Sequence, residues 1–570
     1  MPPPSPSSPF VASPSSIAFG DVQMGTTGAV QQVTITNTGS APLPITQIFV
    51  NPLEFQLQAP PTLPLTLNPG TAATIQLIFT PDAPQSFTGQ LTVLGNSSTP
   101  PAAVPLNGTG TGFPAQVAPV SLVVHDTPPS GVSILSFEIE IAGASLQASS
   151  GSGTVPLTTT AGGIELEHLQ TKSGYLGSMG IAPDIYDSLT VTFADPTMSI
   201  LNDSGATLTA GGTSCAAGQV CQLQPPLNQT SVTVNSNPPF PLSLSASAGI
   251  TIALDFNISS SVQGDLSISP AVSVSAQNNG QTGVNQNEDE LEFFGLVDSI
   301  YPSYQSFTLR VGSGSRPATL ATSAATQFHF ENQNCSAENF TCLDGVGLVR
   351  VEAEVNNGTL TADEVDGIAQ NVLTFSSEVP PADEALGTIV SVDPAQSQFQ
   401  LVLHDLEGGD RFPTLALGLP VMVSVQSSSA FDVDAGGLSL SGGLSFSSPA
   451  NFMAGQEVSI SLAGLQTSGS ATTLDTNRVT LERSDVSGTV ASVDTSQSTL
   501  TLTNLPSLFT VQGITQILVE TGSFTEFEDV AGLGRLGANQ PVSAGGLLLQ
   551  DPNNANEPIL VASAVRVRQD

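Results

Sequence analysis

Apolar and polar residues alternate along much of this 570-residue chain, and this period of two constrains the fold more than any other feature. Successive side chains of a β-strand point to opposite faces of the sheet, so alternation predicts strands with one buried face and one solvated face. Typical runs are QQVTITNTG, ILSFEIEIAG, SLTVTF and STLTLTN, each bounded by turn-forming residues. Helical periodicity is scarce, and the 53 glycines and 43 prolines suit turns and strand edges. We therefore predict an all-β chain.

The second half of the chain contains an internal repeat. Three segments, which start at Gly295, Gly387 and Gly488, place Ser and apolar residues at identical spacings after the glycine. Each unit reads as two strands around a tight turn, a variable middle and two further strands, which suits a small Greek-key or OB-like barrel. We predict a linker and three barrel repeats, with the bounds 277–292 for the linker and 293–370, 385–483 and 485–570 for the repeats.

The first 112 residues carry the turn signals of a separate β-domain. Asn37-Thr38-Gly39 lies between two alternating runs and predicts a β-hairpin, and Pro69-Gly70 predicts another turn. Residues 1–9 are rich in Pro and Ser and are expected to be a disordered leader, and the domain itself is expected over 10–112.

This N-terminal region resembles the Ig-like family of ASPM–SPD-2–Hydin (ASH) domains, including the copies in bacterial exported proteins of the choice-of-anchor D type. The residues that carry the resemblance are Phe19-Gly20, Gly25, Asn37-Thr38-Gly39, Leu43, Phe55, Pro69-Gly70, Phe79-Thr80-Pro81, Gly89 and Leu106-Asn107-Gly108-Thr109-Gly110. The resemblance implies an Ig-like sandwich that serves as a docking or spacing module.

Two weaker resemblances cover the rest of the chain. Residues 117–276 resemble a bacterial exported family catalogued as unknown-function family 4382, through His125-Asp126-Thr127-Pro128 and a late Leu254-Asp255-Phe256 strand. This resemblance implies a second β-sandwich and transfers no catalytic residue. The three repeats resemble unknown-function family 5666, which often occurs in tandem in exported proteins.

The charge balance excludes two classes of partner. The chain has 10 Lys and Arg residues against 48 Asp and Glu residues, and its formal net charge is -38. Such a field repels phosphate backbones and anionic lipid, so we expect no nucleic-acid binding and no binding to a membrane surface. No run approaches the roughly 20 apolar residues of a membrane span, so none is expected.

The cysteines form two local pairs, Cys215 with Cys221 and Cys335 with Cys342. Each pair is a candidate disulfide that closes a small loop, which implies an oxidising compartment; the alternative is four free thiols in polar loops. The N-terminus lacks the charged and apolar regions of a secretion signal. We nevertheless expect an extracellular or cell-envelope location, because the rest of the composition suits an exported protein.

We find no catalytic constellation in the sequence. The four histidines, which are His125, His168, His329 and His404, are far apart and predict no shared metal site. The motifs of nucleophile elbows, phosphate loops and zinc proteases are missing. Acidic loops such as 551–558 offer oxygen ligands for a structural calcium ion, but they lack the spacing of a calcium loop. We therefore assign no catalytic, cofactor or metal residue.

These observations favour a non-catalytic exported or cell-surface protein, a string of β-domains that acts in adhesion, spacing or the binding of a protein or surface polymer. The alternative is an array of carbohydrate-binding modules, for which Tyr301 and Tyr304 are the candidate ligand contacts. The chain has no Trp and only four Tyr, so the aromatic platforms of sugar sites are few. A hydrolytic enzyme is the least favoured class.

Overall fold

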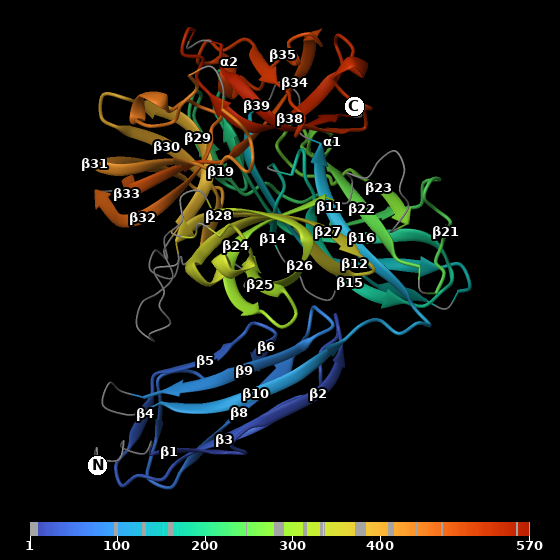
Figure 1. The fold of residues 1–570 in the computed structure, drawn as a ribbon, viewed down its shortest axis with the longest axis vertical. Helices are drawn as coiled ribbons and strands as arrows, with labels where there is room; N and C mark the ends of the chain where they lie inside the picture. Colours follow the sequence, from blue (N-terminus) through green and yellow to red (C-terminus); the bar gives the residue numbers. More distant parts are fainter. Residues whose placement is uncertain are drawn as a thin grey trace. The chain divides into compact units, whose positions relative to one another are not determined.

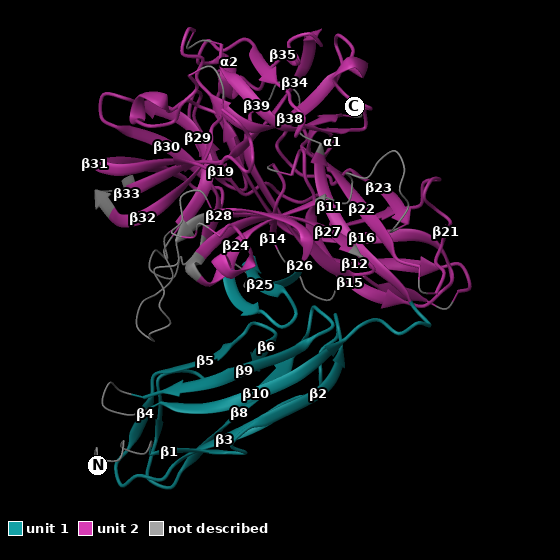
Figure 2. Cartoon of the chain, in the orientation of Figure 1, with its two compact units in different colours: residues 1–117, 297–311, 315–321 teal, residues 118–296, 312–314, 322–570 magenta. Residues whose placement is uncertain are grey.

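The computed structural model forms two compact units (Figure 2), each of which is described by itself. Unit 1 comprises residues 1–117, 297–311 and 315–321, and unit 2 comprises residues 118–296, 312–314 and 322–570. The structure describes residues 9–95, 101–127, 133–151, 153–157, 163–167, 169–246, 248–278, 290–311, 316–330, 335, 337–370, 384–407, 415–440, 443–468, 471–554 and 557–568. Residues 1–8 of the expected leader, residues 279–289 of the expected linker and His168 lie outside this set.

An N-terminal β-sandwich makes up most of unit 1 (Figure 1). Its first sheet has the order β1(Phe10–Ser13)-β3(Gln31–Asn37)-β8(Ala72–Phe79)-β6(Phe55–Gln58). Its second sheet has the order β2(Ile17–Gln23)-β10(Ala102–Thr111)-β9(Ser86–Leu94)-β5(Gln47–Asn51), and β4(Leu43–Ile45) pairs with β7(Leu65–Leu67). Alternate residues of these strands form one core, in which the Phe55 and Phe79 rings stack with centroids 4.8 Å apart.

The Asn37 turn differs from the hairpin that the sequence predicts. Strand β3 ends at Asn37 and pairs with β1 and β8. The next strand, β4, pairs with β7 instead of with β3, so the turn does not join two paired strands. The fully buried Asn37 carboxamide donates to the carbonyls of Ala41 (2.8 Å) and Leu67 (2.9 Å) and accepts from the Gly39 amide (2.9 Å). The turn residue was recognised correctly, but the hairpin prediction was wrong, because local turn chemistry does not choose the partner strand.

A second β-sandwich opens unit 2. One sheet has the order β15(Gly174–Ile181)-β11(Ala118–Thr127)-β22(Ile250–Asn257)-β23(Val272–Asn278), in which β11 and β22 run parallel. The long strands β12(Ile134–Ala148) and β16(Ile185–Leu201) dominate the other sheet, and one buried core lies between the two sheets. The shorter elements are β13(Thr154–Pro156), β14(Gly163–Glu165), β17(Leu208–Ala210), β18(Thr213–Cys215), β19(Val220–Leu223), β20(Ser231–Val234), β21(Leu242–Ser243) and α1(Ile258–Ser261).

Three five-stranded barrels follow, and they share one strand order. The first contains β24(Glu290–Tyr301), β25(Ser306–Val311), β26(Arg316–His329), β27(Val346–Asn356) and β28(Thr359–Gln370). The second contains β29(Glu384–Asp393), β30(Gln398–Glu407), β31(Pro420–Val433), β32(Glu457–Ser468) and β33(Ala471–Leu481). The third contains β34(Arg483–Asp494), β35(Thr499–Thr503), β36(Ile517–Glu520), β38(Pro541–Leu549) and β39(Ile559–Val567), with β37(Glu526–Glu528) added beside β39.

In each barrel the first three strands follow in sequence order, the fifth strand comes next and the fourth strand closes onto the first. The third barrel closes through a parallel pairing of β36 with β39, and the second barrel likewise pairs β31 with β33 in parallel. Short helical turns lie in the connections at α2(Ser507–Thr510), η2(Phe340–Gly345), η4(Pro449–Asn451) and η5(Leu533–Arg535).

The apolar residues that recur at the same spacing in the three sequence repeats point to the inner faces of the barrels. Ile389 and Phe399 of the second barrel are fully buried, as are the equivalent Val490 and, almost entirely, Leu500 of the third. Gly387, which leads its repeat, has no room for a side chain, since an added Cβ would lie 2.1 Å from the carbonyl oxygen of Val402 on the neighbouring strand. The sequence repeat thus reflects two requirements of the barrel: buried apolar side chains, and a glycine where two strands lie too close for a side chain.

The all-β prediction of an Ig-like sandwich, a second sandwich and three OB-like barrels is therefore confirmed. The cores are not separate, however. The buried cluster of the second barrel extends to Leu547, Leu549, Ile559 and Val561 of the third. Among the residues that the structure describes, none of the helices has the length and apolar character that crossing a bilayer requires.

Candidate functional site

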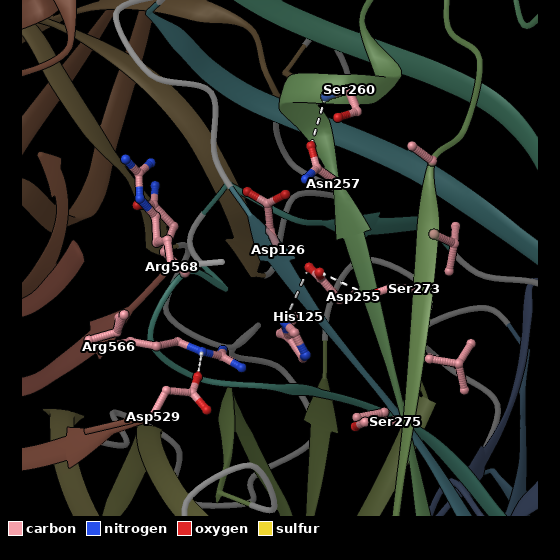
Figure 3. A pocket seen from close by; sticks show the side chains of 16 residues that line it. His125, Asp126, Asp255, Asn257, Ser260, Ser273, Ser275, Asp529, Arg566 and Arg568 are labelled. Carbon is pink, nitrogen blue, oxygen red and sulfur yellow. Dashed lines mark hydrogen bonds and ion pairs between the residues drawn. The ribbon is translucent and has the colours of Figure 1, made fainter. Parts of the chain in front are cut away.

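A polar cavity of about 590 Å³ lies in unit 2, between one sheet of the second sandwich and the last strand of the third barrel (Figure 3). Strand β11 brings His125 and Asp126 to it, and β22 brings Asp255 and Asn257. The opposite wall comes from β39 and the residue that follows it, with Arg566 and Arg568. The other lining residues are Gln170, Ala253, Ser260, Ala271, Val272, Ser273, Val274, Ser275, Asp529 and Val567.

The imidazole of His125 is neutral in this site. Its Nδ1 lies 3.5 Å from Oδ1 of Asp255, a contact that would favour the charged form. Burial outweighs that contact and, with the Arg566 guanidinium adding to the effect, holds the pKa of His125 well below its ordinary value. The other Asp255 oxygen accepts a hydrogen bond from the Ser273 hydroxyl at 3.2 Å (Figure 3).

Asp126 is a buried carboxyl group with a strongly raised pKa. Burial raises its pKa well above the ordinary value, and the carboxylates of Glu167 and Asp255 raise it further. One of its oxygens accepts a long hydrogen bond (3.4 Å) from the Ile258 amide at the start of α1, while Oδ2 has no hydrogen-bond partner among the described residues. Asp126 therefore offers the cavity a buried carboxyl oxygen for hydrogen bonding.

Acidic residues of the third barrel partly neutralise the charge of Arg566 on the wall that carries the two arginines. Nε of Arg566 lies 3.4 Å from Glu528. The same atom lies 3.8 Å from Asp529 (Figure 3). Burial raises the pKa of Glu528 to about 7, although Arg566 and Lys172 act in the opposite direction. The cavity thus combines guanidinium groups on one wall with carboxyl, imidazole and hydroxyl groups on the other.

This arrangement suits binding better than covalent catalysis. A catalytic triad places the imidazole between the hydroxyl and the carboxylate, so that the imidazole takes the hydroxyl proton. Here the carboxylate of Asp255 lies between Ser273 and His125, and the serine hydrogen bond goes to the carboxylate. The site can donate and accept hydrogen bonds on several sides of a polar molecule, but its serine is not activated by the histidine.

The residues singled out from the sequence are dispersed in the structure. Cys215 is bonded to Cys221 and Cys335 to Cys342, with Cα–Cα distances of 5.7 and 5.6 Å. Both pairs lie outside the cavity lining.

The two tyrosines named as ligand contacts differ in exposure. Tyr304 is 49% exposed, whereas the Tyr301 ring packs edge-on against Phe87 with centroids 5.5 Å apart inside unit 1. The Tyr301 hydroxyl is buried, and burial together with the nearby Glu54 carboxylate raises the pKa of Tyr301. Tyr301 therefore offers no open face on which a sugar ring would stack, and ligand contact by either tyrosine stays a prediction.

Sequence reasoning missed the cavity. It placed His125 and Asp126 on a strand that ends in a turn, and β11 does end at Thr127. The pairing of this strand with β22 brings Asp255 beside His125, and no sequence spacing indicates that Arg566, more than 300 residues away, faces them. The one available signal was the presence of ionisable residues inside otherwise apolar strands.

The comparisons with known proteins identify the N-terminal domain. The family described as "Abnormal spindle-like microcephaly-assoc'd, ASPM-SPD-2-Hydin" matches residues 7–103, so this part of the chain is an ASH domain, as the sequence predicts. The resemblances of the second sandwich and of the repeats to families of unknown function stay predictions. A comparison with curated proteins gave no match.

Among solved structures, the Vibrio cholerae VesB protease is 14% identical over 18% of this chain and 32% of its own, with a TM-score of 0.16. The YadV chaperone is 14% identical over 38% of this chain and 100% of its own, with a TM-score of 0.14. The class 5 fimbriae chaperone CfaA is 11% identical over 38% of this chain and 99% of its own, with a TM-score of 0.14. At such TM-scores these similarities say nothing about activity.

Proposed function

We propose that the chain is a non-catalytic, exported or cell-surface protein that binds a protein partner through its ASH domain. The second sandwich and the barrels then serve as the scaffold to which the ASH domain is attached. The observation that supports the proposal most directly is the edge of the second sheet of the N-terminal sandwich.

Strand β5 is the terminal strand of that sheet, since it pairs with β9 on one side and has no neighbour on the other among the described residues. Its sequence, QIFVN, carries no charge, and Phe49 is 45% exposed. Soluble proteins usually protect such edges with charges, prolines or bulges. An uncharged edge with an exposed aromatic ring fits a partner that adds its own strand by main-chain hydrogen bonds and buries the ring.

Two features support an oxidising compartment. Both cysteine pairs are bonded, as is usual in exported proteins and rare in reducing compartments. The acidic, lysine-poor surface adds solubility outside the cell. Alkylation of free thiols immediately after lysis of the source cells, followed by mass spectrometry, tests this part: four alkylated cysteines would contradict it.

The edge is tested by Phe49→Asp, with Val511→Asp as the matched control because Val511 is also an exposed apolar residue, at 60%. Chain labelled at its N-terminus is added to intact source cells, and binding is measured by flow cytometry. We expect the Phe49 variant to bind at least tenfold more weakly and the Val511 variant to bind as the wild type does. Equal binding of both variants would refute a role for β5, and concentration-dependent sedimentation abolished by Phe49→Asp would identify the partner as a second copy.

The cavity favours a second function, the binding of a small polar ligand such as an acidic sugar. Its volume of about 590 Å³ and its walls of opposite charge suit a molecule with one carboxylate and several hydroxyls. Calorimetry with glucuronic acid and glucose tests this: we expect binding of the acid, weakened at least tenfold by Asp255→Asn. Equal affinity for the two sugars, or none, would refute it.

A further inference from the structure

We propose that the first barrel holds a divalent transition-metal ion between His329, Glu364 and Asp366. His329 is the last residue of β26, and the two acidic residues lie on β28. Residues two apart on a strand share one face, so Glu364 and Asp366 point to the same side of the barrel. One ligand atom from each of the three side chains lies within 4.8 Å of the other two.

The distances suit a bound ion after a small adjustment. Zinc lies about 2.0 to 2.2 Å from nitrogen and carboxylate-oxygen ligands, so two ligands of a tetrahedral ion are about 3.4 Å apart. Ligand atoms separated by at most 4.8 Å reach that spacing by rotation of the two acidic side chains and the imidazole.

Two of the three groups have coordinating atoms without another partner. Asp366 is only 2% exposed, and its buried Oδ1 accepts no hydrogen bond from the described residues. The Nε2 atom of His329 is likewise buried and without a hydrogen-bond partner there. A buried polar atom without a partner destabilises the fold, so its retention calls for an explanation, and a metal ion supplies one.

The local charge points the same way. The site belongs to an ionic cluster in unit 2, in which three buried cationic side chains contact seven carboxylates. The cations are Lys172, Arg350 and Arg483, and the carboxylates are Glu292, Glu352, Glu364, Asp366, Asp434, Glu482 and Glu526. The excess of negative charge favours an added cation over a neutral ligand.

The Arg483 guanidinium contacts only one oxygen of each of the two carboxylates in the proposed metal site. Its Nη2 donates to Oε1 of Glu364 at 2.9 Å and lies 3.5 Å from Oδ2 of Asp366. The second oxygen of each carboxylate remains for a metal, and the guanidinium then fixes the first oxygen, as outer partners of metal ligands commonly do.

The ligand types select the class of metal. Calcium and magnesium prefer all-oxygen sites, whereas an imidazole together with two carboxylates suits Zn²⁺ or Mn²⁺. Three protein ligands leave a fourth position, which water completes in zinc sites that are not closed.

The test uses the full chain, freed of metal with a chelator and titrated with Zn²⁺ by calorimetry. The variants are His329→Gln and, as a matched control in the same barrel, Glu354→Gln, because Glu354 is exposed on the neighbouring strand β27. We expect one bound Zn²⁺ per chain, affinity weakened at least 100-fold by His329→Gln, and a change within twofold for Glu354→Gln. Circular dichroism establishes that each variant is folded.

Three results would overturn the proposal. Wild-type chain that binds no Zn²⁺ or Mn²⁺ more tightly than about 100 µM has no specific site. Unchanged affinity in His329→Gln places the metal elsewhere. Ca²⁺ bound as tightly as Zn²⁺ shows that the imidazole contributes nothing. As a second readout, Co²⁺ in this site should give visible absorption bands that His329→Gln alters and Glu354→Gln does not.

Discussion

Arg350 gives the sharpest test of how the strands of the first barrel that belong to unit 2 are held against the second barrel. It lies on β27 of the first barrel and is 3% exposed. Its guanidinium donates to Asp434 and, at 2.5 Å, to Glu482, both of which follow strands of the second barrel. We predict that Arg350→Met destabilises unit 2 far more than the loss of a surface arginine.

The magnitude follows from the protonation of Glu482. Burial, with the Asp434 carboxylate adding to it, raises the pKa of Glu482 to about 8, although Arg350 opposes this shift, so Glu482 is mostly protonated at pH 7. Arg350 and Asp434 are then the charged pair, and Glu482 contributes a further hydrogen bond. A charged hydrogen bond contributes about 1.5 to 3 kcal/mol and a neutral one about 1 kcal/mol, and Asp434 also loses its buried counter-ion. The expected loss is about 3 to 5 kcal/mol.

The control is Arg310→Met. Arg310 also forms an ion pair, with Asp298 at 3.0 Å, but the Arg310 side chain is 39% exposed although that of Asp298 is 4% exposed. Water can therefore replace part of the lost interaction, and Arg310→Met should be less destabilising than Arg350→Met. Differential scanning calorimetry at pH 7 separates the transitions of a multidomain chain. A loss for Arg350→Met below about 1 kcal/mol, or no larger than that of Arg310→Met, would refute the assignment of Arg350 as a buried counter-ion.

Two further predictions concern unit 1. Burial, with Asp82 adding to it, raises the pKa of Glu54 from 4.5 to about 8, so wild-type stability should fall as the pH rises through this window. Glu54→Gln should be more stable than wild type by about 4 kcal/mol at pH 8 but not at pH 4, measured by urea unfolding, and an equal difference at both pH values would contradict this. Asn37→Ala should lose about 3 kcal/mol with the three hydrogen bonds of the Asn37 carboxamide, and Asn37→Asp should be no better because it lacks the two donors. A melting temperature of Asn37→Asp equal to that of the wild type would show that the donors are unimportant.

Alternation and repetition predicted the strands and barrels because both are properties of short segments. The burial of Ile389, Phe399 and Val490 follows directly from the period of two. The hairpin expected at Asn37 failed for the complementary reason. Asn37 does form the turn, but its strand pairs with β1 and β8, and that choice depends on the packing of the whole sandwich.

Neither candidate site was accessible to such reasoning. His125 meets Asp255 because β11 pairs in parallel with β22, and it faces Arg566 because the second sandwich packs on the third barrel within unit 2. His329 meets Asp366 across two strands of the first barrel. These neighbours are set by tertiary packing, which local patterns do not encode.

Composition gives the net charge of the chain but not which charged side chains are buried. The sequence has 10 Lys and Arg residues against 48 Asp and Glu residues. The structure buries the one lysine, Lys172, beside Glu352, and it also buries Arg350 and Arg483 among carboxylates. With so few cations, Arg350 and Arg483 each contact three acids. The sequence determines how many charges the chain has, and the fold determines which of them are buried. The buried carboxylates outnumber the buried cations, and the proposed metal site is one consequence of that difference.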